Sequence, residues 1–302
     1  MSELKKHLSL SEQVDKLSSR GLVISNRGQA ERLLFSLNYY RLTGYLHDFR
    51  QPGSDCYIEG LNLTTLKRIY DFDRRLTRIL MFALEDVEET LKSRLSYTMT
   101  SHYPDDPLVY LDPTVYRNKE EFERFKKLFQ REVKNNSGLP FVKHHIEKYD
   151  GQMPMWVAVE LFTMGNLSAL YKNIYTPIQK ELARSYQTGP NQLTSWIENL
   201  TYTRNHLAHY MRIYNFNFGR TPKKCSNHTA YRGASNRIFD QICVMSYMYS
   251  DPEEWNSYVV PEIAQIIDEY SDCIDLSCLG FPVDWVEILT ISANKTEEPV
   301  MV

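Results

Sequence analysis

The fold is decided by the stretch LTTLKRIYDFDRRLTRILMFALEDVEETLKSRLSYTMTS, residues 63–101. This stretch contains neither Pro nor Gly, and its apolar residues recur every three or four positions, at Leu66, Ile69, Leu76, Leu80, Ala83, Leu84, Val87, Leu91 and Leu95. Such a period is typical of an amphipathic helix. We therefore predict one long helix over residues 63–101.

Three carboxylates on this predicted helix are candidate supporting residues for a functional site. With successive side chains about 100° apart around the axis, Asp73 falls inside the apolar stripe, Glu88 falls on its edge and Glu85 points further out. A polar group on a buried stripe needs a partner, and a buried ion pair is the usual one. We therefore favour a structural role over a catalytic one for Asp73 and Glu88.

The other helical patterns are shorter, and the sequence predicts an all-α protein. Pro52-Gly53 and Glu59-Gly60 mark a loop, so residues 48–62 are expected to hold at most a short hairpin. The expected segments are an N-terminal helical segment with this loop (1–62), a helical core (63–218) that includes a second important helix (191–215), a C-terminal helical segment (219–292) and a disordered tail (293–302).

The composition is that of an ordinary globular protein without a strong overall charge. The 302 residues are 42% apolar and 24% charged, and the formal net charge is −3. Because no overall basic field attracts nucleic acid, any RNA site must be a local basic patch. The candidates for phosphate contact are Arg41, Arg212, Arg220, Lys223 and Lys224.

The cysteines and the N-terminal sequence point to the cytoplasm. The five cysteines form no CxxC pair, so the sequence predicts neither a disulfide framework nor a zinc ribbon, and a reducing compartment fits best. Residues 1–7 lack the apolar region of a signal peptide. No run of about 18 apolar residues, the length of a membrane-spanning helix, occurs. We predict a cytoplasmic protein with no membrane partner.

The stretch Thr201-Tyr-Thr-Arg204-Asn205-His206-Leu-Ala-His209-Tyr210 is the candidate functional site. Its arginine supplies a permanent cation for phosphate, and a histidine can exchange protons near neutral pH. Metal-free RNA cleavage needs these two properties. The alternative is structural, because Arg and His near a helix end often bind carbonyl groups or pair with carboxylates.

The position of these residues on the predicted helix 191–215 suggests a dimer. Arg204 lies inside the apolar stripe of that helix, and His209 lies about 140° away from it. The two side chains reach one small ligand only if Arg204 bends around the helix or a second copy supplies the other group. Asn205 is placed to orient the His209 ring. His206 and His209 are spaced as in a two-histidine metal pair, but no third ligand is evident, so we predict no metal and no other cofactor.

Five blocks spread over most of the chain carry a family resemblance. They are Asn38-Tyr-Tyr-Arg41-Leu-Thr-Gly-Tyr-Leu46, Tyr70-Asp-Phe-Asp73-Arg-Arg-Leu76, Leu84-Glu85-Asp-Val-Glu88-Glu-Thr-Leu91, Pro154-Met-Trp-Val-Ala-Val-Glu-Leu-Phe-Thr-Met-Gly-Asn-Leu-Ser168 and Arg204-Asn-His-Leu-Ala-His209-Tyr-Met-Arg-Ile-Tyr-Asn215. With these blocks in this order, the chain resembles the Abi-like (abortive infection, AbiD/AbiF-type) proteins of the HEPN superfamily.

The resemblance implies a HEPN-type helical bundle with an N-terminal helical extension and C-terminal helices. It also implies an Arg-x4-6-His ribonuclease motif, which is intact at Arg204, Asn205 and His209. Tyr210, a further supporting residue, stands where relatives often have a second His. Family members look like phage-defence effectors that cleave RNA without metal, generally as dimers. The implied partners are an RNA substrate, a second copy of the chain, and a dedicated non-coding RNA or an antitoxin.

The resemblance implies attack of the ribose 2′-OH on the adjacent phosphate, with His209 as general acid or base and Arg204 on the non-bridging oxygens. Two other hypotheses remain open at this point. In one, the same residues bind RNA or a protein partner without cleavage. In the other, Arg204 pairs with Glu88 inside the bundle and His209 has no role.

Overall fold

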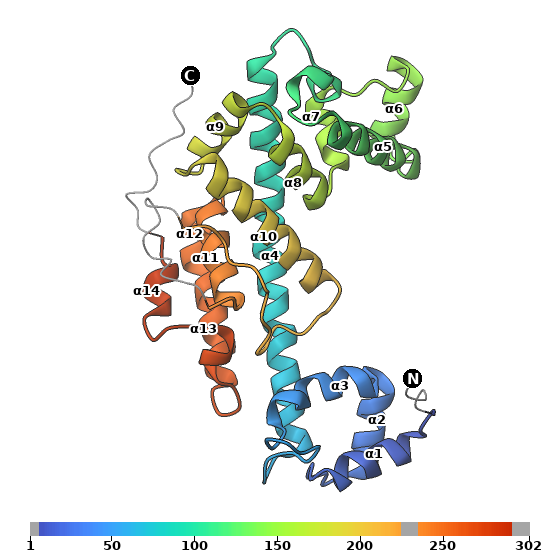
Figure 1. Ribbon diagram of the computed structural model, residues 1–302, viewed down its shortest axis with the longest axis vertical. Coiled ribbons are helices and arrows are strands. Elements are labelled where there is room, and N and C mark those ends of the chain that lie inside the picture. The colour runs from blue at the N-terminus through green and yellow to red at the C-terminus, as the bar shows by residue number, and fades with distance from the viewer. Residues whose placement is uncertain (1–5, 225–234, 292–302) are drawn as a thin grey trace.

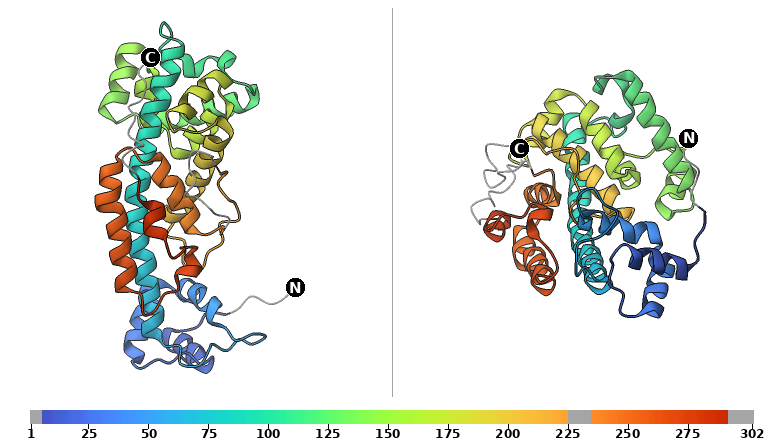
Figure 2. Two further views of the ribbon diagram at one scale, coloured as in Figure 1. Left: turned by 90° about the vertical axis from the view of Figure 1, so that its left-hand side faces the viewer. Right: turned by 60° about the horizontal axis from the view of Figure 1, so that its bottom comes forward.

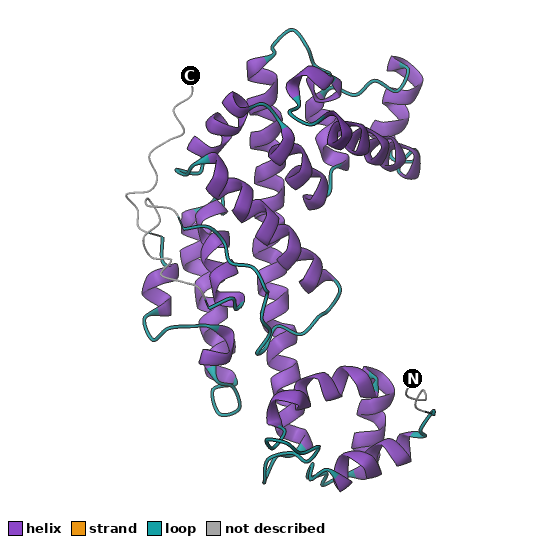
Figure 3. Ribbon diagram, viewed as in Figure 1, coloured by secondary structure: helices purple, strands orange, loops and turns teal. Residues whose placement is uncertain are grey.

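The computed structural model describes residues 6–224 and 235–291, and every regular element in these ranges is a helix (Figures 1 and 3). The prediction of an all-α fold is confirmed. The loop 48–62 holds an isolated antiparallel bridge between Arg50 and Tyr57, and its last residue, Asn62, forms a parallel bridge with Val23. The structure thus agrees with the expectation of at most a short hairpin here. The tail predicted over 293–302 lies outside the described residues.

The central element is α4 (Leu63–His102), which matches the predicted helix to within one residue. The Asn62 side chain accepts a hydrogen bond from the Thr65 N–H at 2.8 Å and so caps the first turn. The predicted apolar stripe is buried along its whole length. Figure 1 shows α4 as a rod that runs through most of the molecule. No helix in the described ranges, α4 included, has an apolar stretch long enough to cross a lipid bilayer.

The other helices pack around this rod at different levels (Figures 1 and 2). At its N-terminal end lie α1 (Leu10–Ser19), α2 (Arg27–Leu37) and α3 (Tyr39–Leu46). Around its C-terminal half lie α5 (Lys119–Asn135), α6 (Pro140–Tyr149), α7 (Met155–Ala158), α8 (Met164–Asn173) and α9 (Thr176–Arg184). Then α10 (Pro190–Ala208) runs back across α4.

The C-terminal part of the chain forms α11 (Ile238–Met248), α12 (Pro252–Glu254), a π-helical turn (Trp255–Val259), α13 (Val260–Glu269) and α14 (Trp285–Leu289). Of these, α11 and α13 pack along another side of α4, and α14 packs on α11 and α13. Arg68 and Arg75 of α4 form ion pairs with Asp272 and Glu269 at the end of α13. Short 3-10 turns complete the structure at His47–Phe49, Val109–Leu111, Pro113–Val115, Val159–Leu161 and Leu276–Leu279.

The carboxylate of Asp73, inside the buried stripe of α4, joins three parts of the chain. It accepts a hydrogen bond from the Tyr45 hydroxyl of α3 at 2.6 Å, and others from the N–H groups of Ile213 and Tyr214 at 3.0 and 2.8 Å. The expectation of a buried ion pair is therefore wrong, because the direct partners are a hydroxyl and two backbone groups. Burial raises the pKa of the Asp73 carboxyl to about 6, although these hydrogen bonds and the charge of Arg212 favour the ionised form.

We expect the raised pKa of the Asp73 carboxyl to appear in the pH dependence of the free energy of unfolding. The pKa of Asp73 is about 6 in the folded protein, against an ordinary value of 3.8. The folded state therefore binds more protons between these values, and the stability that Asp73 contributes is lost as the pH rises through 6. In urea unfolding, the advantage of wild type over Asp73→Asn should shrink by about 1 kcal/mol from pH 5 to pH 7. A difference that stays constant or grows over this range would contradict the raised pKa.

Candidate functional site

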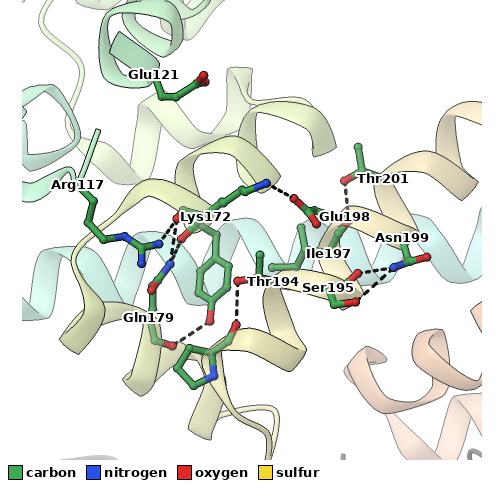
Figure 4. Close-up of polar contacts among 12 residues, drawn as sticks. Arg117, Glu121, Lys172, Gln179, Thr194, Ser195, Ile197, Glu198, Asn199 and Thr201 are labelled. Atoms are coloured by element: carbon green, nitrogen blue, oxygen red, sulfur yellow. Dashed lines mark hydrogen bonds and ion pairs between the residues drawn. The ribbon is translucent and has the colours of Figure 1, made fainter. Parts of the chain in front are cut away.

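The motif stands at the C-terminal end of α10, which is anchored along its length. Lys172 of α8 donates a hydrogen bond to Glu198 of α10 at 2.7 Å (Figure 4), and the Thr201 hydroxyl lies 3.3 Å from the Met164 carbonyl oxygen of α8. The residues of α10 that face the apolar core are Leu193, Trp196, Ile197, Leu200 and Leu207. Packing against the core and an ion pair with α8 thus fix the helix that carries the motif.

α10 ends at Ala208, so the prediction of a helix that continues to residue 215 is wrong. His209 is the C-cap residue, and its N–H still donates to the Asn205 carbonyl at 3.0 Å. Met211, which a longer helix would place on the apolar stripe, is exposed. The motif therefore lies where the chain leaves a helix, and not in the middle of one.

A Schellman motif closes this helix end. The N–H of Tyr210 donates to the Leu207 carbonyl at 2.9 Å, and the N–H of Met211 donates to the His206 carbonyl at 3.1 Å. Tyr210 adopts a left-handed conformation with φ 58°. Glycine usually occupies this position, and a residue with a Cβ atom is strained there by about 1 kcal/mol. Because Tyr210 replaces glycine, the sequence gives no local signal for this helix end.

Arg204 reaches toward α4 and pairs with Glu88. Its Nε lies 3.4 Å from the Glu88 Oε2, and 36% of the Arg204 side-chain surface is exposed. Nη1 of Arg204 also lies 3.5 Å from the Asn205 Oδ1, a long hydrogen bond. Because a guanidinium has five N–H donors, several remain for a ligand. Glu85 is exposed and takes part in no ion pair within the described residues.

His209 faces solvent, and the side chains of Arg204 and His209 leave the helix in different directions. The His209 residue is exposed, and its ring has no hydrogen bond or ion pair within residues 6–224 and 235–291. Asn205 is exposed as well, and its amide oxygen accepts from Arg204. The predicted hydrogen bond from Asn205 to the His209 ring is therefore not present. A single chain offers both groups at one helix end without joining them.

The side chain of His206 is buried and has a structural role. Its Nε2 lies 2.7 Å from the Arg212 carbonyl oxygen. Because a carbonyl only accepts, this nitrogen carries the hydrogen. Burial lowers the pKa of His206, and the ring packs against Phe216 with centroids 4.2 Å apart. In the part of the chain that the structure describes, no three His, Cys, Asp or Glu side chains gather as metal ligands.

Two arginines that lie far from the motif in sequence contact the residue after it. The Arg74 guanidinium of α4 lies 4.7 Å from the centroid of the Tyr210 ring, a cation–π contact. Arg41 of α3 donates from Nη1 to the Tyr210 carbonyl at 2.9 Å. Sequence reasoning listed Arg41 only as an RNA contact and missed Arg74. A helical wheel of α4 alone could not identify Arg74, because its partner lies on a different element.

Of the other candidate RNA contacts, Arg212 is paired within the fold, whereas Arg220, Lys223 and Lys224 are exposed. Arg212 forms an ion pair with Asp48 and lies over the Tyr45 ring, so its charge is used within the fold. Arg220 lies 5.3 Å from the Tyr202 ring centroid and is exposed. Lys223 and Lys224 are exposed as well, and the backbone of Lys223 contacts Ser195 and Trp196 of α10.

Replacement of Tyr210 should separate two effects on stability: the cost of its left-handed backbone and the contribution of the contact between its ring and Arg74. Tyr210→Ala and Tyr210→Gly both remove the contact with Arg74, but only glycine relieves the left-handed conformation. We expect Tyr210→Gly to be more stable than Tyr210→Ala by about 1 kcal/mol in urea unfolding. Equal stability of the two variants, or greater stability of Tyr210→Ala, would mean that φ at this position is not positive.

Comparison with known proteins places these residues in a family. The family model described as Abi-like protein matches residues 32–215, which is more than half of the 302-residue chain. The match runs from α2 to just beyond the Schellman motif, so it includes Arg41, Asp73, Glu88 and the motif itself. Comparisons with curated proteins and with solved structures gave no match. On the evidence of the family model, the chain belongs to the Abi-like protein family.

Proposed function

We propose that this protein is a metal-independent endoribonuclease of the HEPN type that acts in phage defence. Membership of the Abi-like family suggests a role in abortive infection. The observation that carries the proposal is the motif end of α10. There a half-exposed arginine, held by Glu88, lies five residues before a solvent-facing histidine. These are a phosphate-binding cation and a proton carrier at one accessible helix end.

In the proposed reaction the ribose 2′-OH attacks the adjacent phosphorus and the bond from phosphorus to the 5′ oxygen breaks. The products carry a 2′,3′-cyclic phosphate and a 5′-hydroxyl. His209 accepts the proton of the 2′-OH or donates one to the leaving oxygen, a role worth about 10²–10⁴-fold in rate. Arg204 binds the non-bridging oxygens, and Glu88 fixes its orientation.

A dimer completes the proposed site. Within one chain Arg204 extends toward Glu88 on α4, whereas His209 faces solvent. Two copies whose motif ends face each other would bring the arginine of one chain to the histidine of the other. The exposed Met211 beside the motif offers apolar surface for such a contact.

Cleavage of RNA by the purified protein in EDTA should depend on His209. We expect 2′,3′-cyclic phosphate ends, and a rate at least about 10²-fold lower for His209→Ala. The matched control is His144→Ala, which removes another exposed histidine, on α6. It should cut as wild type does. Equal rates for His209→Ala and wild type would rule out this mechanism. Retention of bound RNA without any cleavage, in wild type as well, would favour the alternative of a non-cleaving RNA-binding module.

Mixing of two inactive variants should test the composite site. In a heterodimer of Arg204→Ala and His209→Ala chains, one of the two sites has both groups if each site takes its arginine and histidine from different chains. We expect the mixture to regain activity that neither variant has alone. If the two groups act within one chain, no mixture will be active, whereas wild type will remain active as a dimer or as a monomer.

A further inference from the structure

We propose that an arginine face beside the motif binds the phosphate backbone of the substrate RNA. This face consists of Arg74 and Arg78 of α4 together with Arg41 of α3. The inference rests on the proposed ribonuclease function and extends it, because it assigns binding residues that lie outside the motif. It also assigns a ligand to Arg78, whose side chain forms no hydrogen bond or ion pair with the residues that the structure describes.

The position of the face follows from two contacts between α4 and the motif end of α10. Arg74 contacts the Tyr210 ring, and Glu88 pairs with Arg204. At about 100° per residue, Arg74 and Glu88 lie within about 40° of each other around α4. Arg78 is one turn from Arg74 and about 40° from it. Because these two offsets have opposite directions, Arg78 lies about 80° from Glu88, and its position beside the motif follows from Arg74, which is one turn away and contacts Tyr210.

The arginines of α4 differ sharply in how their charge is used. Arg68 and Arg75 form ion pairs with carboxylates at the end of α13. In contrast, neither Arg74 nor Arg78 has an acidic partner within the described residues, and Arg78 is exposed. Arg41 is exposed too, and it donates to a backbone carbonyl and not to a carboxylate. In a protein whose net charge is −3, three arginines without a carboxylate partner in the described residues thus lie beside the motif, and the exposed carboxylate of Glu85 lies about two turns from Arg78 on the same side of α4.

The chemistry of the face suits a single RNA strand. Side chains four residues apart on a helix lie about 6 Å apart, a separation similar to that of successive phosphates along a strand. The Arg74 guanidinium lies 4.7 Å from the centroid of the Tyr210 ring. A cation–π contact uses none of its N–H donors, so they can bind phosphate oxygens. Tyr210 as a residue is 59% exposed, so a base can approach its ring and stack.

The test measures RNA binding in a background that cannot cleave. Binding of a fluorescein-labelled single-stranded RNA of mixed sequence to the full-length His209→Ala protein is followed by anisotropy in EDTA over a range of salt concentrations. Addition of Arg78→Ala should weaken binding about fivefold at low salt and reduce the slope of log K against log salt by about 0.7, the value for one lost phosphate contact. Arg78→Lys, which keeps the charge, should restore the slope.

The matched control is Arg131→Ala, which removes another exposed arginine, on α5, and should leave affinity and slope unchanged. If Arg78→Ala binds RNA as its parent does, the inference is overturned while the proposed cleavage stands. If Arg78→Ala loses affinity and slope but the wild-type protein cuts no RNA, the arginine face is supported and the ribonuclease proposal fails. If the parent binds no RNA at any salt concentration, both fail. Because Arg78 is exposed and has no hydrogen-bond or ion-pair partner among residues 6–224 and 235–291, we expect the substitution to leave the fold intact, which circular dichroism checks.

Discussion

The buried carboxylate of Asp73 is the interaction on which the functional end of the molecule depends. It lies in the middle of the apolar stripe of α4, where an unpartnered charge would be very costly. Its hydrogen bonds go to Tyr45 of α3 and to two N–H groups just after the motif. One side chain thus connects the N-terminal helices, the central helix and the chain that leaves α10. It also satisfies backbone groups that the early end of α10 leaves without helical partners.

Charged residues on both sides of the motif fix the position of the chain. Arg212 with Asp48, and Arg41 with the Tyr210 carbonyl, fix the chain after α10 against the N-terminal helices. Glu88 fixes Arg204 from the opposite direction. Between these residues, His209 is the C-cap of α10, and within the described part of the chain its hydrogen bonding is through its backbone. The side chains of Asp48, Glu88, Arg41 and Arg212 thus fix the chain around the motif, whereas the His209 side chain is exposed.

The sequence predicted those parts that depend on local patterns. The period of apolar residues located α4 to within one residue because nothing interrupts it over forty positions. The proximity of Glu88 to Arg204 was one of the open hypotheses, since Glu88 lay on the edge of the stripe. The end of α10 could not be predicted, because a tyrosine takes the left-handed position that glycine usually marks and because distant Asp73 captures the following N–H groups. The contact of Arg74 likewise depends on a residue that is distant in the sequence, Tyr210, so the local pattern of α4 does not predict it.

The sequence separation of these contacts has a consequence for the order in which the molecule forms. Asp73 is 140 residues from Ile213, and Arg41 is 169 residues from Tyr210. Contacts of such high order close large loops and form late, whereas helices form locally and early. During synthesis on the ribosome Arg41 and Asp73 emerge first, and they can form these contacts only after residues 210–214 have been made. A nascent or truncated chain that stops before residue 214 lacks the groups that hold the motif end in place. The end of α10 that carries the motif therefore takes up its final structure only when the whole core has been synthesised.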